Sequence, residues 1–486
     1  MAAHDSNLDG IEKMKILLVE DNRSYAETLK ERILSLSTPT GVLLAESRDS
    51  ALALLQNDFF DIIILDLQIP TTDGAFDLEY VHGQEVFFSA LEHAPGTPVY
   101  ILTGSEPDAF LRGLAKHGQS HDIWGDGIPV ATVDYHHKED GDQLLAHLSE
   151  IAPRIAATDA IRINTSGQPI ELKLEQKRAL KVFTRLNGGT SCKLKRLGGL
   201  SDAIVLKVSV LDSTGHVRCE CVGKLGLARH VRKEITAYNS EVTHLRLGAF
   251  AHVISYHDQG LRGFSGIFYA LADQHSDTFF DLALNRPGKA KVVLTSARDA
   301  LSRWSNAGNV NNVTVREVRQ RILSDEHFEK IIAKHNLQGL HALDDRIVSI
   351  ASSCIHGDLH GGNLLVNTKD QPLMIDFGDV GAGYTCLDPI TLELSMLFHP
   401  DARASGLSNH LESSVGDWFN LEVYSANSPV APIVQFCREW AYDVGPHDDS
   451  VLIVAYLFTL RQFKYETVSK DTLTTLLQGI LKALDS

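Results

Sequence analysis

Short runs of apolar residues alternate with helical patterns through the first part of this chain. The runs at 16–19, 62–65 and 99–102 contain no charged side chain. A strand that is apolar on both faces is typical of a parallel sheet covered by helices on both sides. We therefore expect a doubly wound α/β domain with helices over 24–36 and 49–56 between its strands.

Acidic, hydroxyl and lysine side chains follow the carboxyl ends of the predicted strands. Glu20 and Asp21 follow one strand, Asp66 and Thr103 follow two others, and Lys138 follows a strand predicted over 130–135. Functional residues of open α/β sheets gather at this edge. Clustered carboxylates there would bind a hard cation such as Mg²⁺, and one of them could attack phosphorus. The lysine and the hydroxyl would contact the added phosphoryl oxygens.

The segments KILLVEDN, DIIILDLQIPTTDG, VYILTGS and VDYHHKED carry a resemblance to a known family. They resemble a response-regulator receiver domain over about 14–150, which implies a flavodoxin-like fold. The resemblance implies that Asp66 is the phospho-acceptor and that Glu20 and Asp21 hold Mg²⁺ together with it. It also implies that Lys138 contacts the phosphate, and that a sensor histidine kinase is the partner.

The same resemblance gives two further residues a role in switching. Thr103 would be the signalling hydroxyl, and Tyr135 the aromatic residue that turns inward on activation. The chain departs from the family pattern by long gaps on either side of Thr103, which we assign to insertions at 75–84 and 118–127. Another departure is Glu139, which follows the lysine where the family often has proline. The insertions predict unusual partner or domain contacts.

A second segment with many acidic, amide and histidine side chains spans 355–379. It reads IHGDLHGGNLLVNTKDQPLMIDFGD. Asp358 and Asn363 are five residues apart on a polar loop, and Asp376 follows thirteen residues later, after an apolar run. Phosphoryl transfer from ATP needs a carboxylate that orients or deprotonates the attacking group. It also needs an amide and a second carboxylate that hold Mg²⁺ on the phosphates.

This segment resembles the aminoglycoside phosphotransferase and choline kinase families, which share the protein-kinase-like fold. By that resemblance Asp358 is the catalytic base, Asn363 and Asp376 are Mg²⁺ ligands, and His356 supports the loop. The resemblance covers about 190–486 and implies a bilobal domain. We expect the following organisation: a disordered segment over 1–13, the receiver over 14–150, a helical connector over 151–190, a kinase-like N-lobe over 191–275 and a mainly helical C-lobe over 276–486.

The predicted N-lobe contains a glycine-rich hairpin, with strands over 203–210 and 217–224, and a helix over 228–240. By the resemblance, Lys224 would contact the ATP phosphates and Glu234 would be its ion-pair partner. Lys207, on the preceding strand, is a rival for the lysine role. The turn before the hairpin would cover the phosphates; its candidate residues are Gly198, Gly199 and Ser201.

The acceptor is predicted from the length of the segment that follows Asp376. Only about eleven residues separate Asp376 from Asp388 and Pro389, and no Ala-Pro-Glu motif follows. This favours a small-molecule hydroxyl or amine over a protein acceptor. Acidic residues of the helical tail, such as Glu393, would either hold a cationic acceptor or form an ordinary solvated surface.

Charge and cysteine content exclude several classes of protein. The net charge of −17 disfavours non-specific binding to nucleic acid or to an anionic membrane surface. The apolar runs are far shorter than a membrane span. The six cysteines form no CxxC pair, which disfavours a disulfide scaffold. We expect a soluble, cytoplasmic protein.

The leading hypothesis is a two-component response regulator whose output is an ATP-dependent, Mg²⁺-dependent phosphotransferase regulated through Asp66. One alternative is a nucleotide-binding scaffold of the pseudokinase type, whose receiver controls a partner or homodimer interface. Another alternative is a protein kinase. A transcription factor is disfavoured because no helix-turn-helix or basic patch follows the receiver. A hybrid histidine kinase is disfavoured because no phospho-accepting histidine helix pair is apparent.

Overall fold

The computed structural model describes residues 13–485, apart from 105–112, 114–117, 166, 198–202, 272–276, 307 and 427. The segment predicted to be disordered, 1–13, lies outside the described residues except for Lys13. The chain divides into two compact units. The first comprises 1–232 and 252–271, and the second comprises 233–251 and 272–486.

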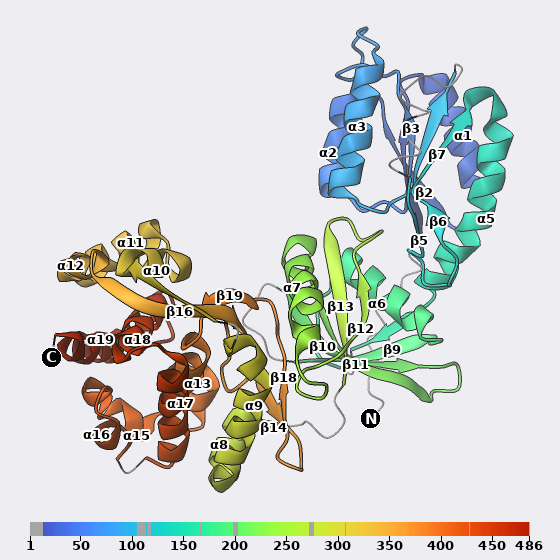
Figure 1. Ribbon diagram of the computed structural model, residues 1–486. Coiled ribbons are helices and arrows are strands. Elements are labelled where there is room, and N and C mark those ends of the chain that lie inside the picture. The colour runs from blue at the N-terminus through green and yellow to red at the C-terminus, as the bar shows by residue number, and fades with distance from the viewer. Residues whose placement is uncertain are drawn as a thin grey trace. The chain divides into compact units, whose positions relative to one another are not determined.

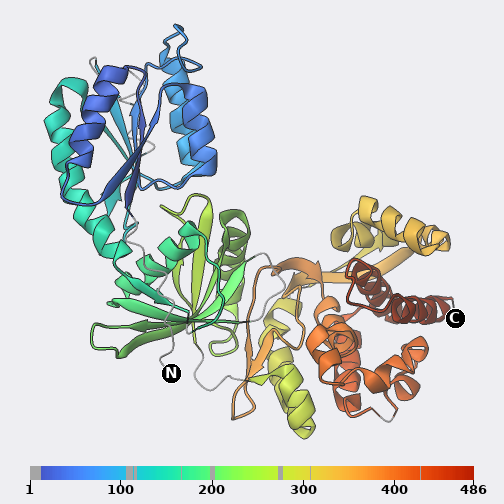
Figure 2. The ribbon, with the colours of Figure 1, turned by 180° about the vertical axis from the view of Figure 1, so that it is seen from behind.

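The first unit begins with a five-stranded parallel sheet in the order β2-β1-β3-β4-β7 (Figure 1). Its strands are β1 (Met14–Val19), β2 (Thr40–Ala45), β3 (Ile62–Asp66), β4 (Val99–Thr103) and β7 (Val133–His137). Helices cover both faces of the sheet, as both ribbon views show (Figures 1 and 2). They are α1 (Arg23–Leu34), α2 (Arg48–Asn57), α3 (Tyr80–His93) and α5 (Gly141–Asp159). The predicted doubly wound, flavodoxin-like fold is confirmed.

Each face of this sheet has its own apolar core. Ile16, Ile64 and Leu102 pack towards α1 and α5, whereas Leu17 and Ile63 pack towards α2 and α3. Strands buried on both faces need uninterrupted apolar sequence, which explains the runs that identified them.

The segment assigned to a second insertion, 118–127, belongs to a small antiparallel hairpin. Its strands are β5 (Ser120–His121) and β6 (Val130–Ala131). Ile123 and Trp124, between the two strands, are buried in the core beneath α5. The segment therefore extends the receiver core instead of projecting from it.

A six-stranded sheet completes the first unit, in the order β12-β13-β11-β10-β9-β8. The strands are β8 (Arg162–Asn164), β9 (Ser191–Arg196), β10 (Ile204–Leu211), β11 (Val217–Leu227), β12 (Val253–His257) and β13 (Phe264–Ala270). Helix α6 (Leu174–Leu186) packs on one face, where Phe183 stacks on Phe268 at 3.9 Å between ring centroids. Both β8 and α6 lie within the predicted connector, so that segment is part of the sheet structure.

The second unit is mainly helical, with two small sheets. The sheet β14-β17-β18 combines Asp277–Thr278, Leu364–Val366 and Pro372–Met374, and the sheet β15-β16-β19 combines Asn309–Thr314, Ile347–Ile355 and Gly381–Tyr384. Strand β15 and the first half of β16 were not predicted, because Asn-rich and Ser-rich sequence lacks the usual strand composition.

Helix α7 (Ala228–Ser240) contains the boundary between the units. The remaining helices are α8 (Phe279–Asn285), α9 (Ala290–Ser305), α10 (Val315–Ile322), α11 (Asp325–His335), α12 (His341–Asp344), α13 (Leu387–Phe398), α14 (Pro400–Ala404), α15 (Asn409–Glu412), α16 (Leu421–Ser425), α17 (Ala431–Val444), α18 (Asp448–Gln462) and α19 (Lys470–Leu484). Among the described residues, no helix combines the length and apolar character needed to cross a membrane.

Candidate functional sites

The carboxyl edge of the receiver sheet brings three predicted acidic residues together. Glu20 and Asp21 follow β1, and Asp66 ends β3, the strand paired directly with β1. Oxygen atoms of these three carboxylates lie within 4.8 Å of one another. Glu20 and Asp66 are buried, at 1% and 5% exposure. Three closely spaced carboxylates fit the oxygen-donor preference of Mg²⁺.

Lys138 directly follows the edge strand β7 and lies against this acidic cluster. Its Nζ atom is 2.8 Å from Asp66 Oδ2 and 2.8 Å from Glu20 Oε2. Tyr25 Oη donates a hydrogen bond to the Lys138 carbonyl at 3.3 Å. A single ammonium group thus offsets two buried carboxylates that come from different strands.

Burial raises the pKa of both buried carboxyls in this cluster. For Glu20 the negative charge of Asp66 adds to burial, whereas for Asp66 the nearby Lys138 opposes it. Burial disfavours the Lys138 ammonium, but Asp66 and Glu20 outweigh that effect and raise the pKa of Lys138. The lysine is therefore charged at neutral pH, as a phosphate contact requires.

Two predicted switch residues lie on the neighbouring strands β4 and β7. Thr103 ends β4, and its register partner on β7 is His137. Tyr135 lies on β7 and is 49% exposed, so its ring faces outward in this structure. Tyr135 is therefore in the outward position of the predicted switch.

The predicted catalytic loop is held by backbone hydrogen bonds. Asp388 Oδ2 accepts from the His356 amide at 2.8 Å, and Asp388 Oδ1 accepts from the Gly357 amide at 2.9 Å. Gly357 has φ of +81°, and a Cβ atom there would lie 2.4 Å from the Asp379 carbonyl oxygen. Only glycine fits this backbone conformation and this close approach. The loop before Asp358 is therefore shaped by its main chain.

The three predicted catalytic and metal-binding residues are tied to one another through this loop. Asn363 Nδ2 donates to the Asp358 carbonyl at 2.9 Å. The amide of Ile375, one residue before Asp376, donates to the Asn363 carbonyl at 3.1 Å. His356, which is fully buried, has its Nε2 atom 3.1 Å from the Ile375 carbonyl. The loop and the strand leading to Asp376 thus form one hydrogen-bonded structure.

Asp376 adopts a backbone conformation that is uncommon for a residue with a side chain. Its φ is +62°, in the left-handed region. Such a conformation costs about 1–3 kcal/mol and is concentrated at functional sites. A Cβ atom on Gly378 would lie 3.6 Å from Asp376 Oδ1 and 3.9 Å from Glu234 Oε2. Glu234, only 1% exposed, therefore lies beside the same loop.

The side chain of Asp358 is next to two histidines that are neutral. His360 Nε2 is 3.7 Å from Asp358 Oδ2, and the rings of His360 and His399 are 4.5 Å apart between centroids. Burial lowers the pKa of both imidazoles to about 4. Burial also raises the pKa of Asp358, although His356 and Arg461 oppose this. A carboxyl with a raised pKa is better suited to accept a proton.

The predicted ATP-binding residues are distributed between the described and undescribed parts of the chain. Gly198, Gly199 and Ser201 lie outside the described residues. Lys224 lies on β11 between Gly223 and Leu225, which face the core under α6, so alternation places Lys224 on the other face. Its rival Lys207 forms a surface ion pair with Glu220 at 3.2 Å.

One proposed acceptor-binding residue has a different role. Glu393 is fully buried, and its carboxylate accepts two hydrogen bonds from Arg438, at 2.7 and 3.0 Å. It also accepts from Trp418 Nε1 at 2.7 Å. The idea that Glu393 holds a cationic acceptor is therefore wrong, because the carboxylate is fully engaged inside the helical core.

Sequence reasoning identified Asp388 only as a landmark after Asp376, not as the residue that holds the catalytic loop. The signal was available: an aspartate directly before proline at the start of an apolar helix. Its function as an acceptor for two loop amides depends on the tertiary structure, in which α13 starts beside the loop.

Sequence profiles of two families match separate parts of the chain. The profile of the response regulator receiver domain matches residues 16–121, and that of the phosphotransferase enzyme family matches residues 302–406. The chain carries a receiver domain and a phosphotransferase-family domain. Both predicted resemblances are confirmed. The receiver match includes Asp66 but ends before Lys138, and the phosphotransferase match includes Asp358 and Asp376.

One curated relative and several solved structures are similar to parts of the chain. Sensor histidine kinase AruS of Pseudomonas aeruginosa is 36% identical to this chain over 109 residues. The matched region is 22% of this chain and spans only 10% of the length of AruS. A CheY-like receiver from Methanospirillum hungatei JF-1 is 19% identical, with TM-score 0.23, covering 30% of this chain and 97% of that chain. A thermostable mutant of aminoglycoside phosphotransferase APH(4)-Ia is 12% identical, with TM-score 0.37. The match covers 60% of this chain and 95% of that chain.

Proposed function

We propose that this protein is a response regulator whose output domain transfers a phosphoryl group from Mg²⁺-ATP to a small-molecule hydroxyl or amine. The observation that carries the proposal is the linked geometry of the catalytic loop. Asn363 is bonded to the Asp358 carbonyl on one side and to the strand before Asp376 on the other. Phosphoryl transfer depends mainly on positioning and electrostatics, which such a loop supplies.

Each loop residue has a specific role in this proposal. Asp358 orients the attacking hydroxyl or amine and accepts its proton. The Asn363 amide oxygen and the Asp376 carboxylate would hold Mg²⁺ against the phosphates, because both are hard oxygen donors. The strained backbone of Asp376 fixes the direction of its carboxylate at a cost that the rest of the loop must offset.

The receiver would control this activity through phosphorylation of Asp66, with a sensor histidine kinase as the phosphoryl donor. Glu20 and Asp21 would hold Mg²⁺ beside Asp66. Lys138, already in contact with Asp66, would then pair with the added phosphoryl oxygens. Phosphorylation adds negative charge to a buried group and so changes its pairing with this lysine.

Regulation needs a physical connection between the receiver and the output domain, and helix α6 supplies one within the first unit. Arg178 on α6 donates to Asp61 at 2.7 Å, and both side chains are buried. Asp61 directly precedes β3, and Asp66 ends the same strand. The opposite face of α6 packs on the six-stranded sheet through Phe183 and Leu180. One strand and one helix thus link the phospho-acceptor to that sheet.

A second set of contacts reinforces this connection. Arg185 Nη1 donates to the carbonyls of Trp124 and Arg154, at 3.1 and 2.8 Å. The Gly260 amide, in the loop between β12 and β13, donates to the Pro95 carbonyl at 2.8 Å. The receiver therefore contacts the six-stranded sheet through segments at the amino ends of its own strands, whereas Asp66 lies at the carboxyl edge.

The proposed activity is tested by measuring ADP release from Mg²⁺-ATP by the full-length protein. We expect slow turnover that Asp358→Asn reduces by about 10²–10⁴-fold, because a general base contributes that much. Asp345→Asn is the matched control, since Asp345 is exposed and pairs with Arg316 on the surface of the second unit. Nucleotide binding without Asp358-dependent turnover, in the presence of an acceptor library, would favour the scaffold alternative.

Regulation is tested by adding beryllofluoride, which mimics an aspartyl phosphate. We expect beryllofluoride to change the rate of ADP release by the wild-type protein and to leave that of Asp66→Asn unchanged. The same rate with and without beryllofluoride would disprove regulation through Asp66 and leave the phosphotransferase activity standing.

The α6 connection predicts a separate result. Arg178→Met leaves two buried carboxylates, Asp61 and Asp159, without this cation, which costs about 3–5 kcal/mol of stability. The double variant Asp61→Asn, Arg178→Met keeps an acceptor for the Lys15 amide, which donates to Asp61 at 2.8 Å, and should recover part of that stability while removing the ion pair. We expect the double variant to keep basal ADP release but to lose at least half of the response to beryllofluoride. A full response would show that the signal takes another route.

A further inference from the structure

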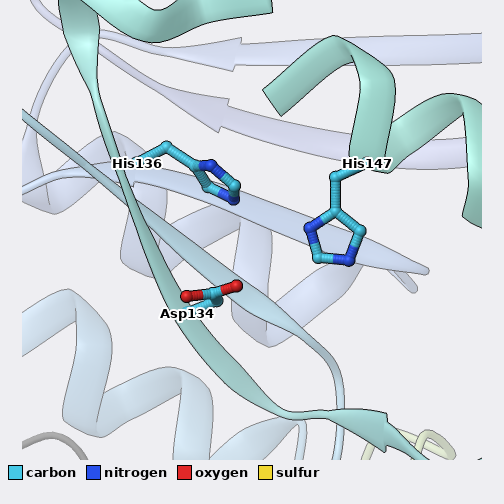
Figure 3. Close-up of side chains that lie close together, drawn as sticks. All are labelled: Asp134, His136 and His147. Carbon is cyan, nitrogen blue, oxygen red and sulfur yellow. The ribbon is translucent and has the colours of Figure 1, made fainter. Parts of the chain in front are cut away.

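One cluster of metal-binding side chains lies in the receiver, away from its acidic phosphorylation site. Asp134 and His136 are two residues apart on β7, and His147 lies on α5. Each residue offers one ligand atom, and the three atoms lie within 4.8 Å of one another. Figure 3 shows the two imidazole rings facing each other across the space between strand and helix, with the carboxylate beside them.

The fold brings these residues together for a simple reason. Side chains two residues apart on a strand point to the same face, so Asp134 and His136 share the face that α5 covers. Register agrees with this: Asp134 pairs with Tyr100 on β4, whose side chain belongs to the core beneath α5. The histidine from α5 then meets the two strand residues from the opposite side.

Two buried polar atoms in the cluster lack hydrogen-bond partners among the described residues. They are His136 Nε2 and the hydroxyl of Tyr100, a residue with 0% exposure. The Tyr100 ring lies 4.9 Å from that of His147 and 5.8 Å from that of His136, between centroids. Leaving such groups unpaired costs about 1–3 kcal/mol each. A metal ion bound by His136 Nε2 would satisfy that atom.

The local charge suits a cation. Arg154, the nearby cation on α5, is neutralised by two hydrogen bonds to Asp126, at 2.8 and 2.9 Å. The cluster therefore carries the negative charge of Asp134.

We propose that Asp134, His136 and His147 form a binding site for a divalent transition-metal ion, with zinc as the best-suited metal. Two imidazoles and one carboxylate are a ligand set that zinc accepts, whereas Mg²⁺ prefers oxygen ligands alone. Tetrahedral zinc with bonds of about 2.0–2.2 Å places its ligand atoms about 3.4 Å apart. Small side-chain rotations bring the present spacing to that value.

The site joins β7 to α5 next to the phosphorylation machinery. His136 is two residues before Lys138, the lysine that pairs with Asp66. Metal binding would fix the strand that carries this lysine. The site is distinct from the acidic cluster of Glu20, Asp21 and Asp66, which has no nitrogen ligand.

The proposal is tested with untagged full-length protein stripped of metal by a chelator. Binding of Zn²⁺ is measured by calorimetry in excess Mg²⁺, which occupies the acidic cluster, and Co²⁺ serves as a spectroscopic probe. We expect one Co²⁺ per chain with visible absorption bands of a low-coordinate nitrogen and oxygen site, displaced by Zn²⁺. The variants His136→Gln and His147→Gln should weaken binding at least about tenfold.

The matched control is His121→Gln, which removes a receiver histidine outside the cluster that bonds to Gln119. It should bind Zn²⁺ as the wild-type protein does. Circular dichroism checks that each variant folds, and His147→Gln, at a half-buried position of α5, carries the test if His136→Gln does not fold. Equal binding by the wild-type protein and His147→Gln would overturn the proposal. Loss of binding in Asp21→Asn instead would also overturn it.

Discussion

The two candidate phosphoryl-transfer sites of this protein position their carboxylates by different means. In the receiver, Asp66 and Glu20 are buried, and a lysine from another strand holds them at 2.8 Å. In the catalytic loop, Asp358 is next to neutral histidines, and the backbone around it is held by Asp388. One site is arranged by a side-chain charge, and the other by main-chain hydrogen bonds.

This difference fits the chemistry proposed for each site. The receiver aspartate would become covalently modified, so a nearby cation that can re-pair with phosphate is useful. The loop aspartate would act on a passing substrate and must keep one geometry through each turnover, which a rigid backbone ensures. Removing the lysine should therefore harm the receiver through charge, and removing Asp388 should harm the loop through geometry.

Among the variants that test this comparison, Lys138→Met should have the largest effect. It leaves two buried carboxylates without a cation, which costs about 3 kcal/mol, at the lower end for a broken buried pair because Lys138 is a quarter exposed. Hydrogen exchange in Mg²⁺-free buffer should show about a hundredfold less protection in β1 and β3. The control Lys30→Met, which removes a surface pair with Glu27, should change protection little. Equal protection in both variants would contradict the charge argument.

A smaller effect is expected from Asp388→Asn. The oxygen of the new side-chain amide can accept from only one of the two backbone N–H groups, of His356 and Gly357, and its NH₂ group faces the other. We expect this to cost about 1–3 kcal/mol of stability. We expect catalysis to fall by about tenfold or more while ATP binding changes less, because the loop shifts and the nucleotide contacts remain. ADP release and nucleotide titration would measure the two quantities. A variant with unchanged turnover would show that Asp388 does not position the loop.

The smallest expected effect concerns pH. The pKa values of His360 and His399 are about 4 in the fold, below the value near 6.5 of an unfolded chain. The stability these residues contribute is therefore complete above pH 6.5 and is lost as the pH falls towards 4. Each histidine should account for about 1 kcal/mol near pH 6.

The raised pKa values of Glu20 and Asp66 act in the opposite direction, so the receiver should gain stability as the pH falls from neutrality. Denaturation of the full chain at pH 7.5 and pH 6 would test the contrast, with exchange followed separately in the two sites. His399→Gln should flatten the pH dependence of the catalytic loop and leave that of the receiver unchanged. The same pH response in both sites would contradict the predicted opposite pH dependence of the receiver and the catalytic loop.

The sequence by itself determined the receiver fold and the identity of its acidic residues. Strands such as 62–66 are apolar on both faces and end in a carboxylate, so local composition predicts both the strand and the edge where Asp66 lies. The motif around Asp358, Asn363 and Asp376 was equally local, because its residues are separated by five and thirteen positions. Helix α7 was predicted with its observed bounds for the same reason.

Only the tertiary structure decided which distant groups serve these residues. Asp61 and Arg178 are 117 positions apart, and their burial together depends on how α6 packs between two sheets. His147 meets Asp134 and His136 only because α5 covers that face of β7. Glutamate is usually found on the surface, but Glu393 is buried because Arg438 and Trp418 donate hydrogen bonds to its carboxylate. Periodicity predicts which face of an element is buried, but the partner across that face is fixed only when the chain folds.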